Sequence, residues 1–232
     1  MQPQFSTALI VGAGSGLSAA LARRFAEEGL NVALAARQTD KLAGIAAATR
    51  ASVFACDAGD AGDVARLFEQ VETSLGAPDV VVYNASARAR GALIDLDPEA
   101  VAQAIRVSAF GGFLVAQQAA RRMMPHGHGA ILFTGASASV KGYKLSAPFA
   151  MGKFALRGLA QSLARELHPQ GIHIGHFVID GGIAGESRKP GADAPDSLLD
   201  ADAIAATYWH VLQQPRSAWT WEVELRPWVE TF

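Results

Sequence analysis

Short, uniformly apolar runs alternate along the chain with longer runs in which apolar and polar positions are mixed. The short runs are rich in Val, Ile, Leu and Ala, as is typical of strands buried on both sides of a sheet. They predict six strands, at Thr7–Val11, Val32–Ala36, Ser52–Ala55, Val80–Tyr83, Ala130–Thr134 and Ile172–Ile179.

The longer runs repeat their apolar residues with the period of an amphipathic helix. They predict helices at Leu17–Glu28, Asp40–Arg50, Asp60–Leu75, Pro98–Met124 and Ala147–His168. Because fully apolar strands alternate with helices, the pattern indicates a Rossmann-type, doubly wound α/β fold with a mainly parallel sheet covered on both faces.

The pattern changes after the sixth strand. Gly181–Ser197 is rich in Gly, Pro, Ser and charged residues and predicts a mobile loop, so we expect a flexible substrate loop at about 182–199. A helix at Asp200–Gln213 and a last strand at Ala218–Leu225 follow. All elements are expected to form a single domain over residues 1–232.

Composition narrows the class of protein. Of the 232 residues, 50% are hydrophobic and 18% are charged, which excludes a disordered chain. The net charge of -2 gives no basis for nucleic-acid binding, and no apolar run is long enough to predict a membrane span. One cysteine, Cys56, and a polar start without a signal peptide lead us to expect a cytoplasmic protein.

A glycine-rich turn directly follows the first predicted strand and opens the first helix. It runs Gly12-Ala13-Gly14-Ser15-Gly16-Leu17. Glycine lets a pyrophosphate approach the backbone, and the helix start supplies free N–H groups and partial positive charge. The alternative is a tight turn that uses glycine only for its shape, but its place in the first strand–helix unit favours a dinucleotide site.

The residue after the second strand indicates which dinucleotide. An acidic residue there would bind the ribose 2′-hydroxyl of NAD(H), whereas this chain has Arg37. Arginine pairs with a 2′-phosphate, to which Ser15 can add a hydroxyl contact, so NADP(H) is favoured over NAD(H). The alternative is that Arg37 is a solvated residue at a helix start.

Taken together, these features resemble the short-chain dehydrogenase/reductase family over nearly the whole chain. Gly12 and Gly16 match the family's glycine motif, with Ser18 where its third glycine usually lies. The resemblance implies further cofactor-binding residues at Asp57, Ala58, Asn84, Ala85, Ser86, Gly181 and Ile183. It also identifies Lys153 as the lysine of the Tyr-x-x-x-Lys motif, which would hold the nicotinamide ribose.

The chain departs from the family at the residues that handle the proton. Phe149 occupies the position of the tyrosine that donates or accepts it. The serine position falls at Ala136, or at Ser137 if the loop is one residue shorter, and the asparagine position falls at Ser108. Tyr143 could act as a substitute acid, although an ordinary loop tyrosine is the simpler interpretation.

These departures leave two hypotheses. The first is an NADP(H)-dependent oxidoreductase with an atypical site, which transfers a hydride to or from a small carbonyl, imine or activated alkene. The second is a catalytically silent NADP(H)-binding protein that acts as a sensor or assembly partner. The resemblance also implies a homodimer or homotetramer. No metal site is expected, because His126 and His128 lack a suitably placed third ligand.

Overall fold

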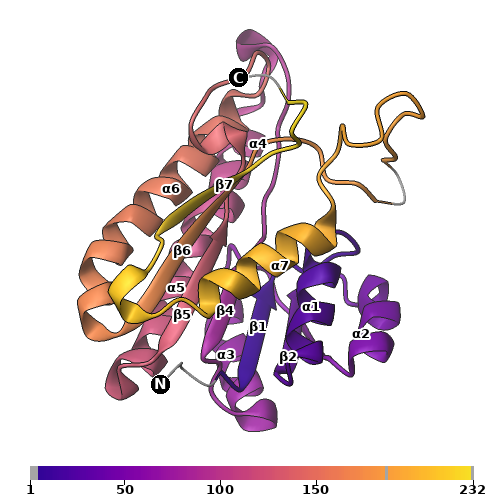
Figure 1. Ribbon diagram of the computed structural model, residues 1–232. Helices are drawn as coiled ribbons and strands as arrows, with labels where there is room; N and C mark the ends of the chain where they lie inside the picture. The colour runs from indigo at the N-terminus through magenta and orange to yellow at the C-terminus, as the bar shows by residue number, and fades with distance from the viewer. Residues whose placement is uncertain (1–4, 186–187, 231–232) are drawn as a thin grey trace.

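The computed structural model describes residues 5–185 and 188–230, and these contain one parallel sheet. Its strands are β1 (Thr7–Val11), β2 (Asn31–Ala36), β3 (Ser52–Ala55), β4 (Val80–Tyr83), β5 (Gly129–Thr134), β6 (Ile172–Ile179) and β7 (Glu222–Leu225). They lie in the order β3-β2-β1-β4-β5-β6-β7. Figure 1 shows the sheet with its flanking helices. This arrangement confirms the predicted Rossmann-type α/β fold.

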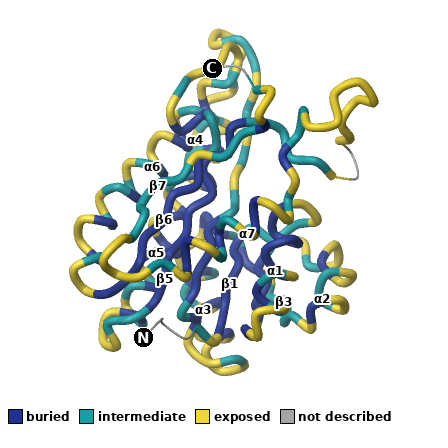
Figure 2. The backbone as a smooth tube through the Cα atoms, viewed as in Figure 1, coloured by how far each residue is buried: buried dark blue, intermediate teal, exposed yellow. Residues whose placement is uncertain are grey.

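Helices cover both faces of the sheet. One face carries α1 (Leu17–Glu27), α2 (Ala43–Thr49) and α7 (Ala201–Leu212); the other carries α3 (Ala61–Leu75), α4 (Pro98–Ile105), α5 (Gly111–Met123) and α6 (Ala147–Leu167). Each face has its own apolar core, and Figure 2 shows the central strands buried between the two layers. The uniformly apolar strands are explained by this double coverage.

Three elements differ from the sequence prediction by more than one residue. The predicted helix Asp40–Arg50 begins as a 3-10 turn at Asp40–Leu42, and its α-helical part is α2 (Ala43–Thr49). The predicted helix Pro98–Met124 is interrupted by a π-helical turn at Arg106–Phe110, which separates α4 from α5. The last strand begins at Glu222 instead of Ala218, because Arg216–Ala218 forms a 3-10 turn and the Trp219 indole donates a hydrogen bond to the Gln214 carbonyl.

The helical run Pro98–His126 has the length and hydropathy of a membrane span. However, 44% of its apolar window is buried inside the protein, and residues of α5 within this run pack in the apolar core on one face of the sheet. We therefore assign no membrane-spanning role to it.

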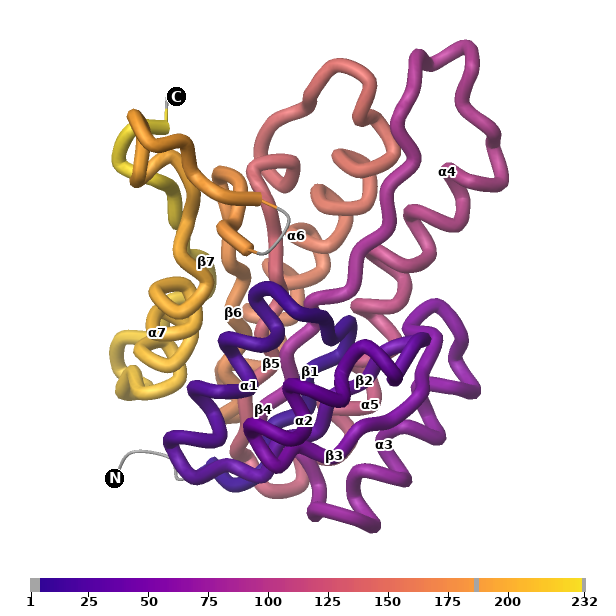
Figure 3. Tube along the Cα trace, turned by 90° about the vertical axis from the view of Figure 1, so that its right-hand side faces the viewer, coloured from indigo at the N-terminus to yellow at the C-terminus, as the bar shows by residue number. Residues whose placement is uncertain are grey.

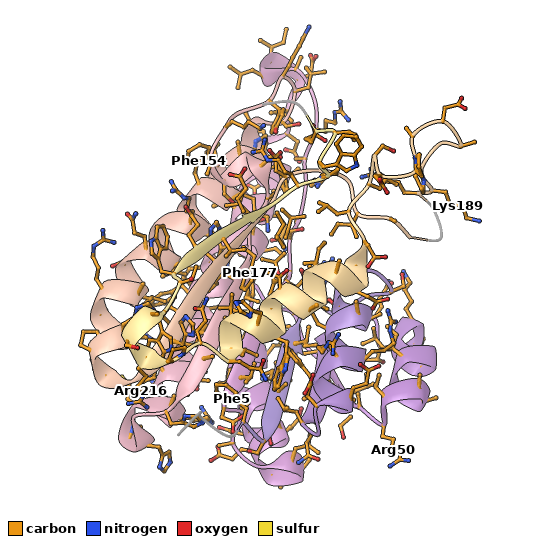
Figure 4. The ribbon with its side chains drawn as sticks, in the orientation of Figure 1. Phe5, Arg50, Phe154, Phe177, Lys189 and Arg216 are labelled. Atoms are coloured by element: carbon orange, nitrogen blue, oxygen red, sulfur yellow. The ribbon has the colours of Figure 1, made fainter. Side chains whose placement is uncertain are left out.

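The connections at the carboxyl ends of the strands gather at one edge of the sheet. Figure 3 shows the connection between β4 and α4 extending beyond the body of the sheet. The described part of the segment after β6 projects from the body, with Lys189 far from the sheet in Figure 4. It contains isolated bridges, such as the one between Ile183 and Leu199, but no regular helix or strand among its described residues. In parallel α/β sheets, this edge is where ligands bind.

Candidate functional site

The glycine turn after β1 packs directly against the loop after β4. Gly12 has a φ of +87°, and a Cβ atom there would lie 2.3 Å from the backbone nitrogen of Ala85. Only glycine fits this position, for both reasons. The turn is also held to β2, because the backbone N–H groups of Gly12 and Ala13 both donate to the Ala35 carbonyl at 2.9 Å.

Asn84 and Ser18 tie this turn together with side-chain hydrogen bonds. The Asn84 Nδ2 donates to Ser18 Oγ at 2.7 Å, and Ser18 Oγ donates to the Gly12 carbonyl at 3.2 Å. Ser18 therefore stabilises the turn through its hydroxyl, at the position where the family's third glycine usually lies. The Asn84 amide, which we expected to contact a cofactor, already has a partner within the turn.

The larger of two adjoining cavities, about 1070 Å³ in volume, lies over this turn. It is lined by Gly12, Ala13, Gly14, Ser15, Ala36, Arg37, Gln38, Lys41, Cys56, Asp57, Ala58, Asn84, Ala85, Ser86 and Val107. Most of the expected cofactor-binding residues thus share one cavity. Among the described residues, no side chain caps the start of α1, so the N–H groups of Leu17 and Ser18 remain available to an anion, whereas that of Ala19 donates to the Gly16 carbonyl.

Asp57 and Cys56 line the wall of the larger cavity beside β3. Asp57 accepts a hydrogen bond from the Gly59 N–H at 2.9 Å through Oδ1, which fixes the carboxylate in the loop. Burial, followed by the charges of Asp63 and Asp57, raises the pKa of the Cys56 thiol to about 12. Cys56 is thus a protonated packing residue, since only the thiolate is a good nucleophile.

The smaller cavity, about 370 Å³, continues from the first along four shared residues, Gly12, Gly14, Asn84 and Ser86. Its other lining residues are Gly16, Leu17, Ser18, Arg88, Thr134, Gly135, Ala136, Phe149, Lys153, Ile179, Gly181, Ile183 and Arg188. The expected residues Gly16, Leu17, Lys153, Gly181 and Ile183 therefore all lie on this wall, beside the turn.

Lys153 is a buried cation in the wall of the smaller cavity. Its Nζ donates a hydrogen bond to the Thr134 carbonyl at 2.6 Å, and its side chain is 3% exposed. Burial and, to a smaller extent, the nearby charge of Arg88 together lower the pKa of Lys153 to about 8. The ammonium can still donate its other two protons to a ligand.

Phe149 lies one turn before Lys153 on α6 and lines the same cavity. Its ring centroid is 5.9 Å from Lys153 Nζ and 4.2 Å from Arg88 Cζ, so the guanidinium covers the ring. A phenylalanine at this place offers an apolar surface and no exchangeable proton.

The alternative proton donors lie elsewhere. Tyr143 is 45% exposed and lines neither cavity, and neither does Ser137. Tyr208 on α7 is fully buried in the opposite core, where its hydroxyl is 2.9 Å from Thr134 Oγ1 and its ring stacks on Phe177. The Ser108 hydroxyl is engaged with the backbone of Ala87, at 3.1 Å from its nitrogen and 3.2 Å from its oxygen.

The sequence analysis missed a buried polar network behind Gly135. His176 Nδ1 lies 3.0 Å from Glu222 Oε2, and Arg157 holds the same carboxylate through two hydrogen bonds of 2.6 and 2.8 Å. Burial lowers the pKa of His176 to about 4, although Glu222 opposes this, so at pH 7 the ring is neutral and its Nδ1–H donates to the Glu222 carboxylate. A Cβ at Gly135 would lie 2.4 Å from His176 Nε2.

Asp180 anchors the segment that follows β6. Its buried carboxylate forms ion pairs with Lys141 at 3.3 Å and with Arg226 at 3.1 Å. The sequence could have indicated Asp180 as a site residue, because it directly precedes the expected cofactor-binding residue Gly181. The missed Arg88 had a similar signal, since it follows β4 in the loop that carries Asn84.

Comparisons with known proteins agree with this geometry. The sequence model of the family described as short chain dehydrogenase matches residues 6–190. The 3-oxoacyl-acyl-carrier-protein reductase MabA of Mycobacterium avium is 31% identical over 199 residues, which are 84% of this chain and 72% of that protein.

Solved structures share the overall fold of this chain. A short-chain dehydrogenase from Rhodopseudomonas palustris has a TM-score of 0.82 at 34% identity, covering 97% of this chain and 100% of that one. An alcohol dehydrogenase from Thermococcus sibiricus, complexed with 5-hydroxy-NADP, has a TM-score of 0.86 at 26% identity, covering 98% and 99%. The chain belongs to the short-chain dehydrogenase/reductase family of oxidoreductases.

Proposed function

We propose that this protein is an NADP(H)-dependent oxidoreductase that transfers a hydride to or from a small carbonyl, imine or activated alkene. The observation that carries the proposal is the continuity of two cavities, one over the glycine turn with Arg37 and the other beside Lys153. The related alcohol dehydrogenase from Thermococcus sibiricus, complexed with 5-hydroxy-NADP, supports a nicotinamide cofactor.

The larger cavity fits a dinucleotide. Gly12 lets the glycine turn pack against Ala85, and the uncapped start of α1 offers partial positive charge to an anion. Arg37 and Lys41 line the same cavity, and the end of β2 has no acidic residue that would repel a 2′-phosphate. In the proposal, Asp57 holds the adenine and Lys153 the nicotinamide ribose.

The bound nicotinamide would supply or accept the hydride, so the protein itself must orient the substrate and manage the proton. We propose that Phe149 stands where related enzymes hold a phenol. Loss of a general acid costs about 10²- to 10⁴-fold in rate, whereas positioning alone contributes roughly 7–11 kcal/mol. A substrate that needs no proton from the protein, such as an alkene that takes its proton from water, therefore suits this site better than a simple ketone.

Titration of NADPH and NADH into the purified protein, followed by fluorescence and calorimetry, tests the cofactor. We expect NADPH to bind more tightly, because the Arg37 guanidinium pairs with the 2′-phosphate. Arg37→Gln should weaken NADPH binding about tenfold and change NADH binding little. Arg121→Gln, an exposed arginine on α5, is the matched control. Failure of both cofactors to bind would contradict the proposed function.

Restoring a phenol tests the position of Phe149. Phe149→Tyr places a hydroxyl one helical turn from Lys153, whose ammonium favours the phenolate and so assists proton transfer. We expect NADPH-dependent ketone reduction to increase by about 100-fold. Phe149→Leu, which also removes the phenylalanine but adds no acid, should show no such gain. Equal ketone reduction by the two variants would contradict this assignment.

A further inference from the structure

The smaller cavity concentrates positive charge. Arg88, Lys153 and Arg188 all line it, and its described lining residues include no carboxylate. Within residues 5–185 and 188–230, none of these three cations has a carboxylate oxygen within 4.0 Å. Like charges that converge on a cleft without counter-charges create a positive potential that attracts an anionic ligand.

Arg88 is held in place before any ligand binds. The Ser108 hydroxyl bonds to both backbone groups of Ala87, the residue next to it. The guanidinium lies over the Phe149 ring at 4.2 Å, which leaves its N–H groups available at the rim of the cavity. Phe149 thus provides a platform for a cation at the place where a tyrosine would present a hydroxyl.

This charge is separate from the charge that faces the cofactor's 2′-phosphate. Arg37 and Lys41 line only the larger cavity, whereas Arg88 and Arg188 line only the smaller one. Two groups of cations therefore serve two different parts of the groove. The smaller cavity is also lined by Gly16, Leu17, Gly181 and Ile183, which we assign to the cofactor, so a small substrate would share its volume of about 370 Å³ with the nicotinamide end of the cofactor.

We propose that the smaller cavity binds a substrate that carries a carboxylate, and that Arg88 is its anchor. The planar guanidinium matches a carboxylate through two parallel hydrogen bonds, while the Arg188 charge adds attraction from the opposite loop. The substrates would be small unsaturated acids, whose activated double bond can take its proton from water. The inference rests on the proposed hydride-transfer function and specifies the substrate class for the same site.

Benzoate and benzamide form a suitable pair of probes, because they have the same shape and differ in charge. Each is titrated by calorimetry into the free protein and into the protein saturated with NADP⁺. We expect benzoate to bind at least about tenfold more tightly than benzamide. Its binding should also weaken as the salt concentration rises, because ions screen the attraction.

Variants assign the effect to Arg88. Arg88→Gln should weaken benzoate binding about tenfold, while Arg88→Lys, which keeps the charge but not the planar fork, should give an intermediate loss. Arg90→Gln removes an exposed arginine two positions away that lines neither cavity, and it should leave benzoate binding unchanged. Circular dichroism and thermal unfolding would show that each variant keeps its fold.

The outcomes separate the two proposals. Equal affinity for benzoate and benzamide, or unchanged benzoate binding by Arg88→Gln, would overturn the carboxylate site even in a protein that binds NADPH. A loss confined to NADP⁺ binding in Arg88→Gln would assign this arginine to the cofactor and also overturn it. Failure of NADPH and NADH to bind would overturn the proposed function, while titration of the free protein still tests the anion site.

Discussion

At the scale of single residues, Lys153 is a position where stability and function require different side chains. Its ammonium is buried, and among the described residues it donates a hydrogen bond to the Thr134 carbonyl, an uncharged acceptor at 2.6 Å. The cost of this burial appears in its pKa, which falls from 10.5 to about 8. A chain selected for stability alone would place an apolar side chain here.

Lys153→Met should therefore stabilise the fold and abolish tight cofactor binding. The unfolded chain holds the Lys153 proton up to about pH 10.5, whereas the folded protein releases it near pH 8. The penalty is complete below pH 8 and disappears as the pH rises to 10.5, so the variant should gain up to about 3 kcal/mol at pH 7 and progressively less above pH 8. Urea unfolding at several pH values measures this gain, and a variant less stable at pH 7 would contradict it.

The sequence indicated some of these residues and concealed others for a physical reason. Gly12 and Lys153 could be predicted because each belongs to a local pattern, a turn after a strand or a spacing along one helix. The roles of Arg88 and His176 depend on partners from distant elements, α6 for Arg88 and β7 for His176. The spacing of residues within one element does not reveal contacts with distant elements, so these two roles could be identified only from the structure.

At the scale of elements, β6 combines a core strand with two buried histidines. His173 Nε2 lies 2.9 Å from the Thr220 carbonyl, and His176 Nδ1 lies beside Glu222, so both rings join β6 to the segment around β7. Burial lowers the pKa of each histidine to about 4. Both are neutral at pH 7, and protonation of either would place a charge inside the core.

The protein should lose stability in mild acid through this strand. In the unfolded chain the histidines take up protons near pH 6.5, whereas in the folded protein they do so only near pH 4. The free energy of unfolding should fall between pH 6.5 and 4, by up to about 3 kcal/mol for each histidine. His176→Gln should remove roughly half of this dependence. Equal slopes for the variant and the parent protein in denaturant titrations would contradict the assignment.

The bounds of an element could be predicted from the sequence where the run of apolar residues alone determines them. The six apolar strands were identified with shifts of at most one residue, because burial on both faces requires continuous apolar sequence. The π-helical turn at Arg106–Phe110 was missed, since its residues keep the helical apolar pattern. It brings Ser108 to Ala87 and so supports the loop that carries Arg88.

At the scale of the whole molecule, the helical layer formed by α5 and α6 exposes aromatic side chains. Phe113 and Phe154 are 41% and 45% exposed, and Phe113 stacks with Phe110 at 6.0 Å between ring centroids. Phe154 lies at the outer edge of α6 in Figure 4. Exposed aromatic rings of this kind are enriched at protein interfaces, and we propose a homodimer or homotetramer built through this layer.

Phe113→Glu combined with Phe154→Glu should convert the assembly to monomers. Charges at these positions would have to be desolvated in an interface, whereas water solvates them in a monomer. Analytical ultracentrifugation of the parent and variant proteins measures the mass. Trp228→Glu alters another exposed aromatic residue, outside this layer, and should leave the mass unchanged. A parent protein that sediments as a monomer would contradict the proposed assembly.

The contact between Gly12 and Ala85 also has a consequence for the growing chain during synthesis. Gly12 and Asn84 are 72 positions apart, yet their strands are neighbours in the sheet and their loops touch. The ribosome therefore releases the glycine turn long before it releases the loop against which that turn is shaped. Until β4 has emerged and paired with β1, the nascent protein has the motif for its ligand without the pocket.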